Sequence, residues 1–190
     1  MKDQVRVLGI DDSPFEFGDH RSLVVGALVR TPCYLEAVMK TDVAVDGDDA
    51  TDRLVEMVVR SRYREQVKLI ILDGIALAGF NIVDMEKLHE RTGLPVATVT
   101  RDEPDMGDIE VALKAHFDDW ERRLSLVRRL PLRPLDTGHK PLHASVLGMP
   151  WEDFVQLVLA ATVRGAVPEP VRIAHLISAA MVKGESRGRP

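Results

Sequence analysis

The first 45 residues carry three apolar segments with the length and composition of β-strands. They span residues 5–10, 22–30 and 34–45, and Thr31 with Pro32 provides a turn signal between the last two. Short connections between consecutive strands favour antiparallel pairing. The third segment alternates imperfectly between apolar and polar residues, so we expect one of its faces to lie in water. The pattern therefore predicts an antiparallel meander of three strands.

From residue 51 onward, the apolar positions alternate between helical and strand-like spacing. The predicted elements are, in chain order, a helix beginning near Thr51, a strand over 67–72, a helix over 82–92, a strand over 94–100, a helix over 107–120, a strand over 143–147, a helix after Pro150 and a helix over 171–182. Strands that alternate with helices are typical of parallel pairing, with the helices covering the sheet. The chain therefore predicts an α/β fold.

Two of the predicted strands end on aspartate. The strand over 5–10 is followed by Asp11 and Asp12, and the strand over 67–72 by Asp73. In α/β proteins, ligand sites lie at the carboxyl ends of strands. If these strands are neighbours, Asp11 and Asp73 face each other across a gap that a divalent cation would fill. The alternative is structural, because Asp at a strand end often accepts backbone hydrogen bonds.

More aspartates follow the third strand. Magnesium commonly takes one or two carboxylates and completes its shell with water and phosphate oxygens, and two such ions can flank a phosphodiester displacement. Asp46 follows an apolar run and precedes a glycine, which makes it a candidate for a third ligand, and Asp49 lies close to it. Asp48 and Asp52 fit a solvated loop or a helix cap better.

Composition limits the class of protein. A chain of 190 residues, 45% hydrophobic, can bury one core, so we expect one domain over 1–185 and a flexible tail over 186–190. With a formal net charge of -5, the whole molecule does not attract nucleic acid. A single cysteine, Cys33, excludes an intramolecular disulfide and suits a reducing compartment. Without a signal-peptide pattern or an apolar run near the ~20 residues of a membrane span, we expect a cytoplasmic protein with no membrane contact.

Positive charge gathers late in the chain, between residues 121 and 140. The basic residues are Arg122, Arg123, Arg128, Arg129, Arg133 and Lys140. Arginine suits phosphate contacts, so the segment is a candidate surface for DNA or RNA. A solvated connector interrupted by prolines explains the same pattern without a partner. For His139, His143 and His175 we favour no metal or general-base role, and for His116 a role in packing or capping.

Other enzyme signatures are absent from the sequence. There is no glycine-rich phosphate loop and no dinucleotide-binding glycine motif after a strand. A Gly-x-Ser-x-Gly nucleophile motif is missing, and one cysteine cannot build a Cys/His zinc site. The aspartates that follow the predicted strands therefore remain the candidates for chemistry.

The order of these motifs resembles two related families. The chain resembles endonuclease V in Gly-Ile-Asp-Asp-Ser at 9–13, Leu-Asp-Gly at 72–74, Leu-Pro-Val at 94–96 and the Pro-Glu-Pro-x-Arg-x-Ala type of segment at 167–175. It is more similar still to an uncharacterised, mainly archaeal group, domain-of-unknown-function family 99. The hallmarks shared with that group lie at 9–15, 45–51, 79–84 and 168–183. The resemblance covers essentially the whole chain.

This resemblance implies a ribonuclease H-like fold, with a mixed sheet of five or more strands and helices on both faces. Within that sheet, an antiparallel meander is extended by parallel strands. By similarity to endonuclease V, Asp11 and Asp73 would be carboxylates that bind Mg²⁺ or Mn²⁺. The third carboxylate of that family, a glutamate, would correspond to Asp46 or Asp49.

The chain also departs from endonuclease V. It has no Tyr-x-Pro-Gly wedge motif between Tyr34 and Asp49. The His-Pro-Arg stretch of that family is replaced at 77–80, and its Gly-His pair at 147–149. The wedge and one histidine of the metal shell are therefore missing from the positions at which that family has them.

Three hypotheses follow for the function. The first is a divalent-metal-dependent phosphodiesterase or nuclease related to endonuclease V. The alternative is a catalytically inert module that binds nucleic acid or protein on the same fold, which the missing motifs and the acidic net charge favour. An enzyme that acts on a small nucleotide is the third.

Overall fold

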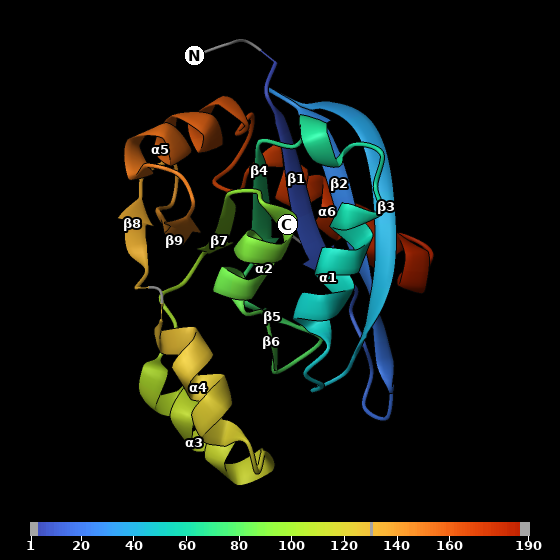
Figure 1. Cartoon of the computed structure of the whole chain (residues 1–190), viewed down its shortest axis with the longest axis vertical. Coiled ribbons are helices and arrows are strands. Elements are labelled where there is room, and N and C mark those ends of the chain that lie inside the picture. The colour runs from blue at the N-terminus through green and yellow to red at the C-terminus, as the bar shows by residue number, and fades with distance from the viewer. Residues whose placement is uncertain (1–3, 130, 187–190) are drawn as a thin grey trace.

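The computed structural model describes residues 4–129 and 131–186. Of the expected flexible tail, positions 187–190 lie outside the described residues. Among the helices that are described, none combines the length and the apolar character needed to cross a bilayer. The centre of the structure is a seven-stranded sheet in the order β3-β2-β1-β4-β7-β9-β8 (Figure 1).

The first three strands form the expected meander. β1 (Arg6–Asp12) pairs antiparallel with β2 (Arg21–Arg30), and β2 pairs antiparallel with β3 (Tyr34–Ala44). β1 and β2 are almost entirely buried, whereas most residues of β3 are exposed or half-buried. The imperfect alternation in the third segment is thus explained by its place at the edge of the sheet.

Parallel strands continue the sheet from β1. β4 (Leu69–Asp73) lies parallel to β1, and β7 (Val96–Thr100) lies parallel to β4. β9 (Leu142–Leu147) and β8 (Arg133–Leu135) then add two antiparallel strands. The predicted mixed sheet, a meander extended by parallel strands, is confirmed.

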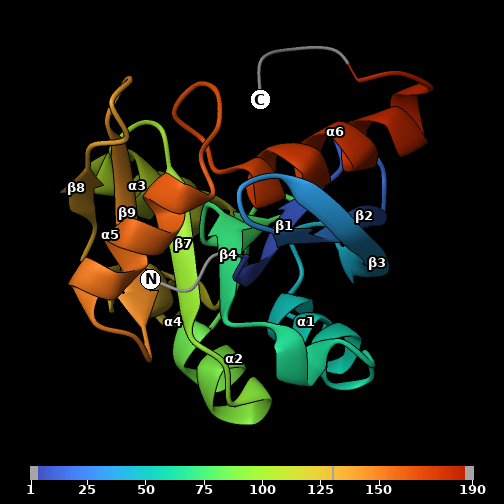
Figure 2. The same cartoon turned by 90° about the horizontal axis from the view of Figure 1, so that it is seen from above.

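Helices cover both faces of this sheet, as the view from above shows (Figure 2). One face carries α1 (Ala50–Val59) and α2 (Met85–Thr92), and the other carries α5 (Trp151–Ala160) and α6 (Glu169–Lys183). Separate apolar clusters fill the space between each helical layer and the sheet. The edge of the sheet therefore stays accessible at the ends of the strands, whereas its two faces do not.

Local signals explain where α2 begins and ends. The carboxylate of Asp84 accepts a hydrogen bond from the backbone N–H of Lys87, which caps the first turn. Gly93 adopts a left-handed conformation with φ of 70° and ends the helix, as the sequence predicted.

The segment between β7 and β8 differs from the prediction. The helix expected over 107–120 ends early, as α3 (Met106–His116), and α4 (Trp120–Arg128) begins four residues later. Phe117 lies at the break, where its ring packs edge-on against Phe80 and under the guanidinium of Arg123. These tertiary contacts override the helical pattern. The two helices form a hairpin beyond the lower edge of the sheet in Figure 1.

A short hairpin after β4 was also not predicted. β5 (Ala76–Leu77) and β6 (Asn81–Ile82) form a small two-stranded sheet. The helix expected from residue 82 therefore begins only at Met85. Two residues per strand are too few for an alternating pattern to stand out in the sequence.

The close contact between β1 and α6 depends on Gly9. A Cβ atom at this position would lie 2.1 Å from the backbone carbon of Pro170 and 2.4 Å from the backbone nitrogen of Val171. Such distances are far inside van der Waals contact, so only glycine lets the helix lie this close to the strand. The opposing atoms belong to the backbone and cannot rotate away.

We therefore expect Gly9→Ala to push α6 off the sheet and lower the free energy of unfolding by about 3 kcal/mol. Urea denaturation measures this loss. The matched control is Gly26→Ala on β2, because a Cβ there would meet side-chain atoms of Met39 and Met57, which can move. Equal losses in the two variants would contradict the account of the β1–α6 contact.

Candidate metal centre

Asp11 and Asp73 lie at the ends of two neighbouring strands. β1 and β4 are parallel, and Ile10 pairs with Leu72, so the two aspartates occupy the next position along each strand. The carboxyl ends of adjacent parallel strands meet at one edge of a sheet. Asp11 is only 6% exposed. The structure thus brings together the two carboxylates that the sequence places at strand ends.

Helix α6 adds a histidine to this pair. Nδ1 of His175 lies 2.8 Å from Oδ2 of Asp11. One ligand atom from each of Asp11, Asp73 and His175 lies within 4.8 Å of the others. Within residues 4–129 and 131–186, this is the one group of three or more His, Cys, Asp or Glu side chains whose ligand atoms lie close enough together to hold a metal ion.

The packing of α6 explains the position of this histidine. Val171, Ala174 and Ser178 are fully buried and recur at helical spacing, so they form the face that packs against the sheet. The hydroxyl of Ser178 donates a hydrogen bond to the backbone oxygen of Asp12. His175 lies one turn after Val171, at the border of the same face.

The environment of these carboxylates disfavours their charged forms. Burial, followed by the neighbouring charges of Asp73 and Asp12, raises the pKa of Asp11 from 3.8 to about 8. Burial also raises the pKa of Asp12, to about 6, and the pKa of Asp73. The positive charges of Arg101 and His175 oppose the shift at Asp73. At neutral pH the metal-free centre therefore retains a proton on Asp11.

Arg101 is the cation that acts on both strand ends. It follows β7, the strand next to β4, and its charge lowers the pKa of Asp11 and of Asp73. Arg101 is not among the residues that the sequence pattern singled out. The available signal was its position directly after a predicted parallel strand, the same signal that identified Asp73.

Asp12 fixes the loop that follows β4. Its Oδ2 accepts a hydrogen bond of 3.0 Å from the backbone N–H of Ala78. Ala78 and Gly79 both have positive φ, 47° and 86°, so this loop follows a path that few residue types adopt. The carboxylate of Asp12 thereby holds the loop beside the metal centre.

Asp46, a predicted third ligand, lies against the same loop. Its backbone N–H donates to the oxygen of Ala78, and its Oδ1 accepts from the N–H of Phe80. A Cβ at Gly79 would lie 2.3 Å from Oδ1 of Asp46. Asp46 is outside the group formed by Asp11, Asp73 and His175.

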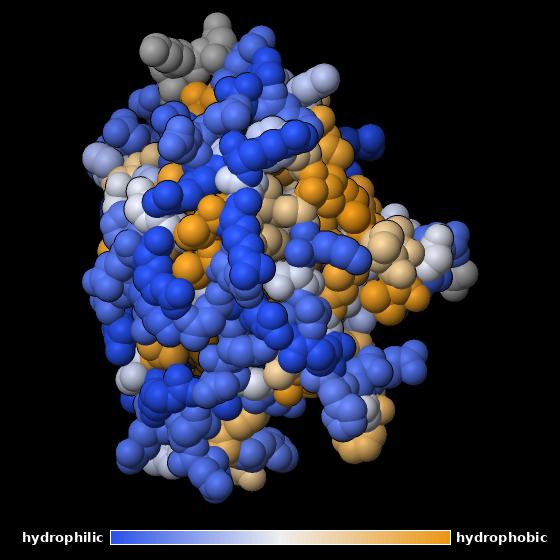
Figure 3. Space-filling view, turned by 45° about the vertical axis from the view of Figure 1, so that its right-hand side comes forward, coloured by the Kyte–Doolittle hydropathy of each residue, from blue (hydrophilic) through white to orange (hydrophobic). Residues whose placement is uncertain are grey.

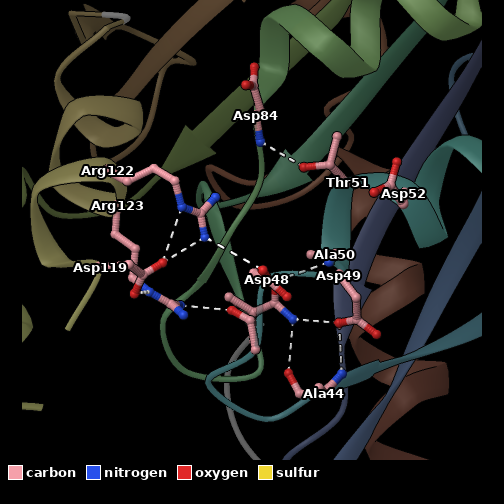
Figure 4. A network of polar contacts seen from close by, with 12 residues as sticks. Ala44, Asp48, Asp49, Ala50, Thr51, Asp52, Asp84, Asp119, Arg122 and Arg123 are labelled. Atoms are coloured by element: carbon pink, nitrogen blue, oxygen red, sulfur yellow. Dashed lines mark hydrogen bonds and ion pairs between the residues drawn. The ribbon is translucent and has the colours of Figure 1, made fainter. Parts of the chain in front are cut away.

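Asp49, the other predicted third ligand, is held in a separate network (Figure 4). Its Oδ1 accepts hydrogen bonds from the backbone of Ala44 and from Nδ2 of Asn81, and its Oδ2 lies 3.3 Å from Arg21. The pKa of Asp49 lies below its ordinary value, because these hydrogen bonds and the charge of Arg21 outweigh the effect of burial. Like Asp46, Asp49 is not part of the group at the strand ends. Its ligand role stays a prediction.

The two remaining aspartates of this region take part in ion pairs. Asp48 lies 3.8 Å from Arg122, and Asp52 pairs with Lys87 and Arg91. Figure 4 shows Asp48 between the α3–α4 hairpin and the start of α1. Both side chains are largely exposed, which agrees with the solvated positions favoured for them.

The basic residues of the late segment have partners of their own. Arg122 and Arg123 pair with Asp119, Arg128 with Glu110, Arg129 with Glu86, Lys140 with Asp102, and Arg133 lies over the ring of Trp151. Arg123 is buried and also donates to the backbone oxygens of Gly47 and Phe80. It fastens the α3–α4 hairpin to two loops of the main body. Much of the charge in this segment is thus compensated within the fold.

A cavity of about 470 Å³ opens beside Asp73. It lies between the ends of β4 and β7, the β5–β6 hairpin and the α3–α4 hairpin. Its lining includes Gly74, Ile75, Thr98, Thr100, Met106 and Ile109. The volume and the largely apolar lining with a few polar groups are typical of sites for small organic groups.

Known proteins resemble this chain over nearly its full length. An uncharacterised UPF0215 protein of Methanothermobacter thermautotrophicus is 43% identical over 189 residues, covering 99% of this chain and 93% of the relative. A crystal structure of a protein of unknown function from Archaeoglobus fulgidus has 37% identity and a TM-score of 0.83, covering 94% of this chain and 98% of that one.

More distant structures share the fold. Endonuclease V of Ciona intestinalis, solved with DNA containing an inosine, has 13% identity and a TM-score of 0.64, covering 95% of this chain and 87% of that one. Argonaute of Marinitoga piezophila, solved with guide RNA and target DNA, has a TM-score of 0.54 at 14% identity, covering 91% of this chain and 29% of that one. The expected ribonuclease H-like fold is confirmed.

The match to a family model is consistent with these relatives. The model described as endonuclease dU matches residues 3–182. This range includes the strand ends that carry Asp11 and Asp73 and the helix that carries His175. The chain therefore belongs to the endonuclease dU family.

Proposed function

We propose that this protein is a divalent-metal-dependent endonuclease that cleaves DNA near a deaminated base. The observation that carries the proposal is the group formed by Asp11, Asp73 and His175, whose ligand atoms lie within 4.8 Å of one another at the edge of the sheet. Edges of this kind are where α/β proteins bind their ligands.

The chemistry of the group fits a divalent cation. Two carboxylates provide the oxygen ligands that Mg²⁺ and Mn²⁺ prefer, and an imidazole can complete the set. Asp11, Asp12 and Asp73 all have raised pKa values, so their charges need a nearby cation for compensation. The proposal does not rest on Asp46 or Asp49, whose carboxylates already accept hydrogen bonds within the fold.

In this mechanism, Asp11, Asp73 and His175 would hold Mg²⁺ or Mn²⁺. When bound, the ion would supply Lewis acidity toward a phosphoryl oxygen and toward water. Arg101, whose charge reaches both aspartates, binds an oxygen of the scissile phosphate and orients it. Asp12 keeps the loop after β4 in place through its hydrogen bond with Ala78.

The cavity beside Asp73 supports a base as the recognised group. Enzymes that recognise a base inside a duplex rotate it out of the stack into a pocket and read it by hydrogen bonds and apolar contacts. The cavity offers Thr98, Thr100 and the backbone of Gly74 next to apolar side chains. Its volume of about 470 Å³ is ample for one base. The family description, endonuclease dU, favours uracil in DNA as that base.

We expect Asp73→Asn to abolish Mn²⁺ binding and the cleavage of uracil-containing DNA, because the pair of facing carboxylates is lost. Calorimetric Mn²⁺ titration and a cleavage assay measure the two effects. Asp52→Asn is the control, since Asp52 is exposed and pairs only with basic side chains among the described contacts. An unchanged Mn²⁺ titration in Asp73→Asn would contradict the proposed centre.

The affinity for Mn²⁺ should depend on pH. Below about pH 8 Asp11 holds a proton in the metal-free protein, and a cation must displace it. Affinity therefore rises by up to about tenfold per pH unit toward pH 8 and then levels off. Titrations at pH 6, 7, 8 and 9 measure this, and equal affinities at pH 6 and 8 would contradict it.

The same shift predicts how the metal-free protein responds to pH. Between 3.8 and about 8, the folded state holds a proton on Asp11 that the unfolded chain has released. The free energy of unfolding therefore contains a contribution that falls as the pH rises through this window. Asp11→Asn should remove that contribution, which urea denaturation at several pH values measures.

Filling the cavity should remove the preference for uracil without removing the metal. We expect Ala76→Trp, on the wall of the cavity, to reduce cleavage at uracil at least about tenfold, since each 1.4 kcal/mol of lost binding is a factor of ten. Mn²⁺ affinity should stay unchanged. Ser61→Trp fills a different hollow, between β3 and α1, and is the control. Full activity in Ala76→Trp would exclude the cavity as the base site.

A further inference from the structure

The turn between β1 and β2 has a hydrogen-bonded backbone and presents one aromatic ring to solvent. The N–H of Asp19 donates to the oxygen of Glu16 at 3.0 Å, and the N–H of Glu16 donates to Oδ2 of Asp19 at 2.8 Å. Gly18 has φ of +100°, the sign that the third position of a type II turn requires. Phe17 therefore occupies the second position, from which its side chain points away from the hairpin.

Phe17 is fully exposed. Its relative exposure of 111% is the highest among the exposed large hydrophobic residues of the described chain. Tyr34, beside the opposite end of β2, reaches 66%. The fold gains no packing from the ring of Phe17, although apolar surface of this size is costly to leave in water. Figure 3 shows this turn as a projection at the lower edge of the molecule, with apolar atoms at its end.

The base of the turn is firmly attached next to the metal centre. Ser13, two residues after Asp11, donates its N–H to the oxygen of Leu23, and its hydroxyl contacts that of Ser22. Phe15 extends toward the loop after β4. The tip of its ring lies 3.6 Å from the place that a Cβ atom at Gly79 would occupy. The position of Phe17 relative to the strand end is thus set by hydrogen bonds at both ends of the loop.

A hollow of about 520 Å³ separates this loop from the end of α6. Its walls are Pro14, Phe15, Glu16 and Asp19 on one side and Val182 and Lys183 on the other. One wall belongs to the loop that follows β1, the strand of Asp11, and the other belongs to α6, the helix of His175. Lys183 contributes a positive charge, and one carboxylate oxygen of Asp19 is turned toward the backbone of Glu16. The loop that carries Phe17 and the helix that carries His175 therefore face each other across this hollow.

We propose that Phe17 stacks on a base of the nucleic-acid strand whose phosphate lies at Asp11 and Asp73. This inference rests on the proposed function, because that function supplies the strand. Stacking on an aromatic ring tolerates any base, since every base has a π-face. The turn fixes the backbone of Phe17 before binding, so only its side-chain torsions lose freedom when a base stacks on the ring. Lys183 lies where it can contact the backbone of the same strand.

Oligonucleotide binding by Phe17 variants tests the proposal. Fluorescence anisotropy with a labelled uracil-containing DNA, in Ca²⁺, measures affinity. Phe17→Ala should weaken binding by about 5- to 150-fold, the range for the loss of one stacked base. Phe17→Trp should bind within about threefold of the wild type, because indole stacks equally well. Mn²⁺ affinity and thermal stability should be unchanged in both, since the ring contacts neither the core nor the metal centre.

Tyr34→Ala is the matched control, because it removes another exposed aromatic ring, at the start of β3 and beside the far end of β2. We expect it to bind the DNA as the wild type does. Wild-type DNA affinity in Phe17→Ala would overturn the inference. A Phe17→Ala variant that loses self-association or binding to another protein, but keeps its DNA affinity, would overturn it as well.

The outcomes also separate this inference from the proposed function. Metal-dependent cleavage that does not depend on Phe17 would overturn the stacking role alone. DNA binding that depends on Phe17, without any metal-dependent cleavage, would overturn the nuclease and retain the stacking role. A wild-type protein that binds no oligonucleotide would overturn both.

Discussion

The close contact between helix α6 and strand β1 is the constraint on which the candidate centre depends. Gly9 permits it, because any larger residue would overlap the backbone of Pro170. The contact places His175 beside Asp11, although 164 positions separate them in the chain. Neither strand nor helix alone would form the group. The absence of a side chain at Gly9 thus allows His175 to join the two strand-end carboxylates in a three-residue site.

The electrostatics of the site lower the stability of the metal-free fold. Burial raises the pKa values of Asp11, Asp12 and Asp73, and neighbouring carboxylates add to the shifts at Asp11 and Asp12. These buried groups therefore make the metal-free fold less stable at neutral pH than at acidic pH. A fold that only needed stability would place apolar or hydrogen-bonded side chains here. Arg101 compensates part of this charge, and a divalent cation would compensate more. Perturbed carboxylates next to a cavity are typical of functional sites.

The sequence predicted the parts of this structure that follow local rules. The meander, the parallel strands and the positions of Asp11 and Asp73 follow from apolar periodicity and from the geometry of strand ends. The position of His175 depends on how α6 packs, and the compensation of Arg128 by Glu110 depends on the α3–α4 hairpin. Neither contact can be predicted from the local sequence pattern. The break at Phe117 likewise results from contacts with Phe80 and Arg123, which lie elsewhere along the chain.

Anomalous diffraction from crystals soaked in Mn²⁺ tests the central claim most directly. The account predicts an anomalous peak about 2.0 to 2.3 Å from oxygens of Asp11 and Asp73 and from a ring nitrogen of His175. Soaking near pH 8 or above favours it, because Asp11 is then deprotonated. A peak at other residues, or none while these three side chains keep their arrangement, would contradict the account.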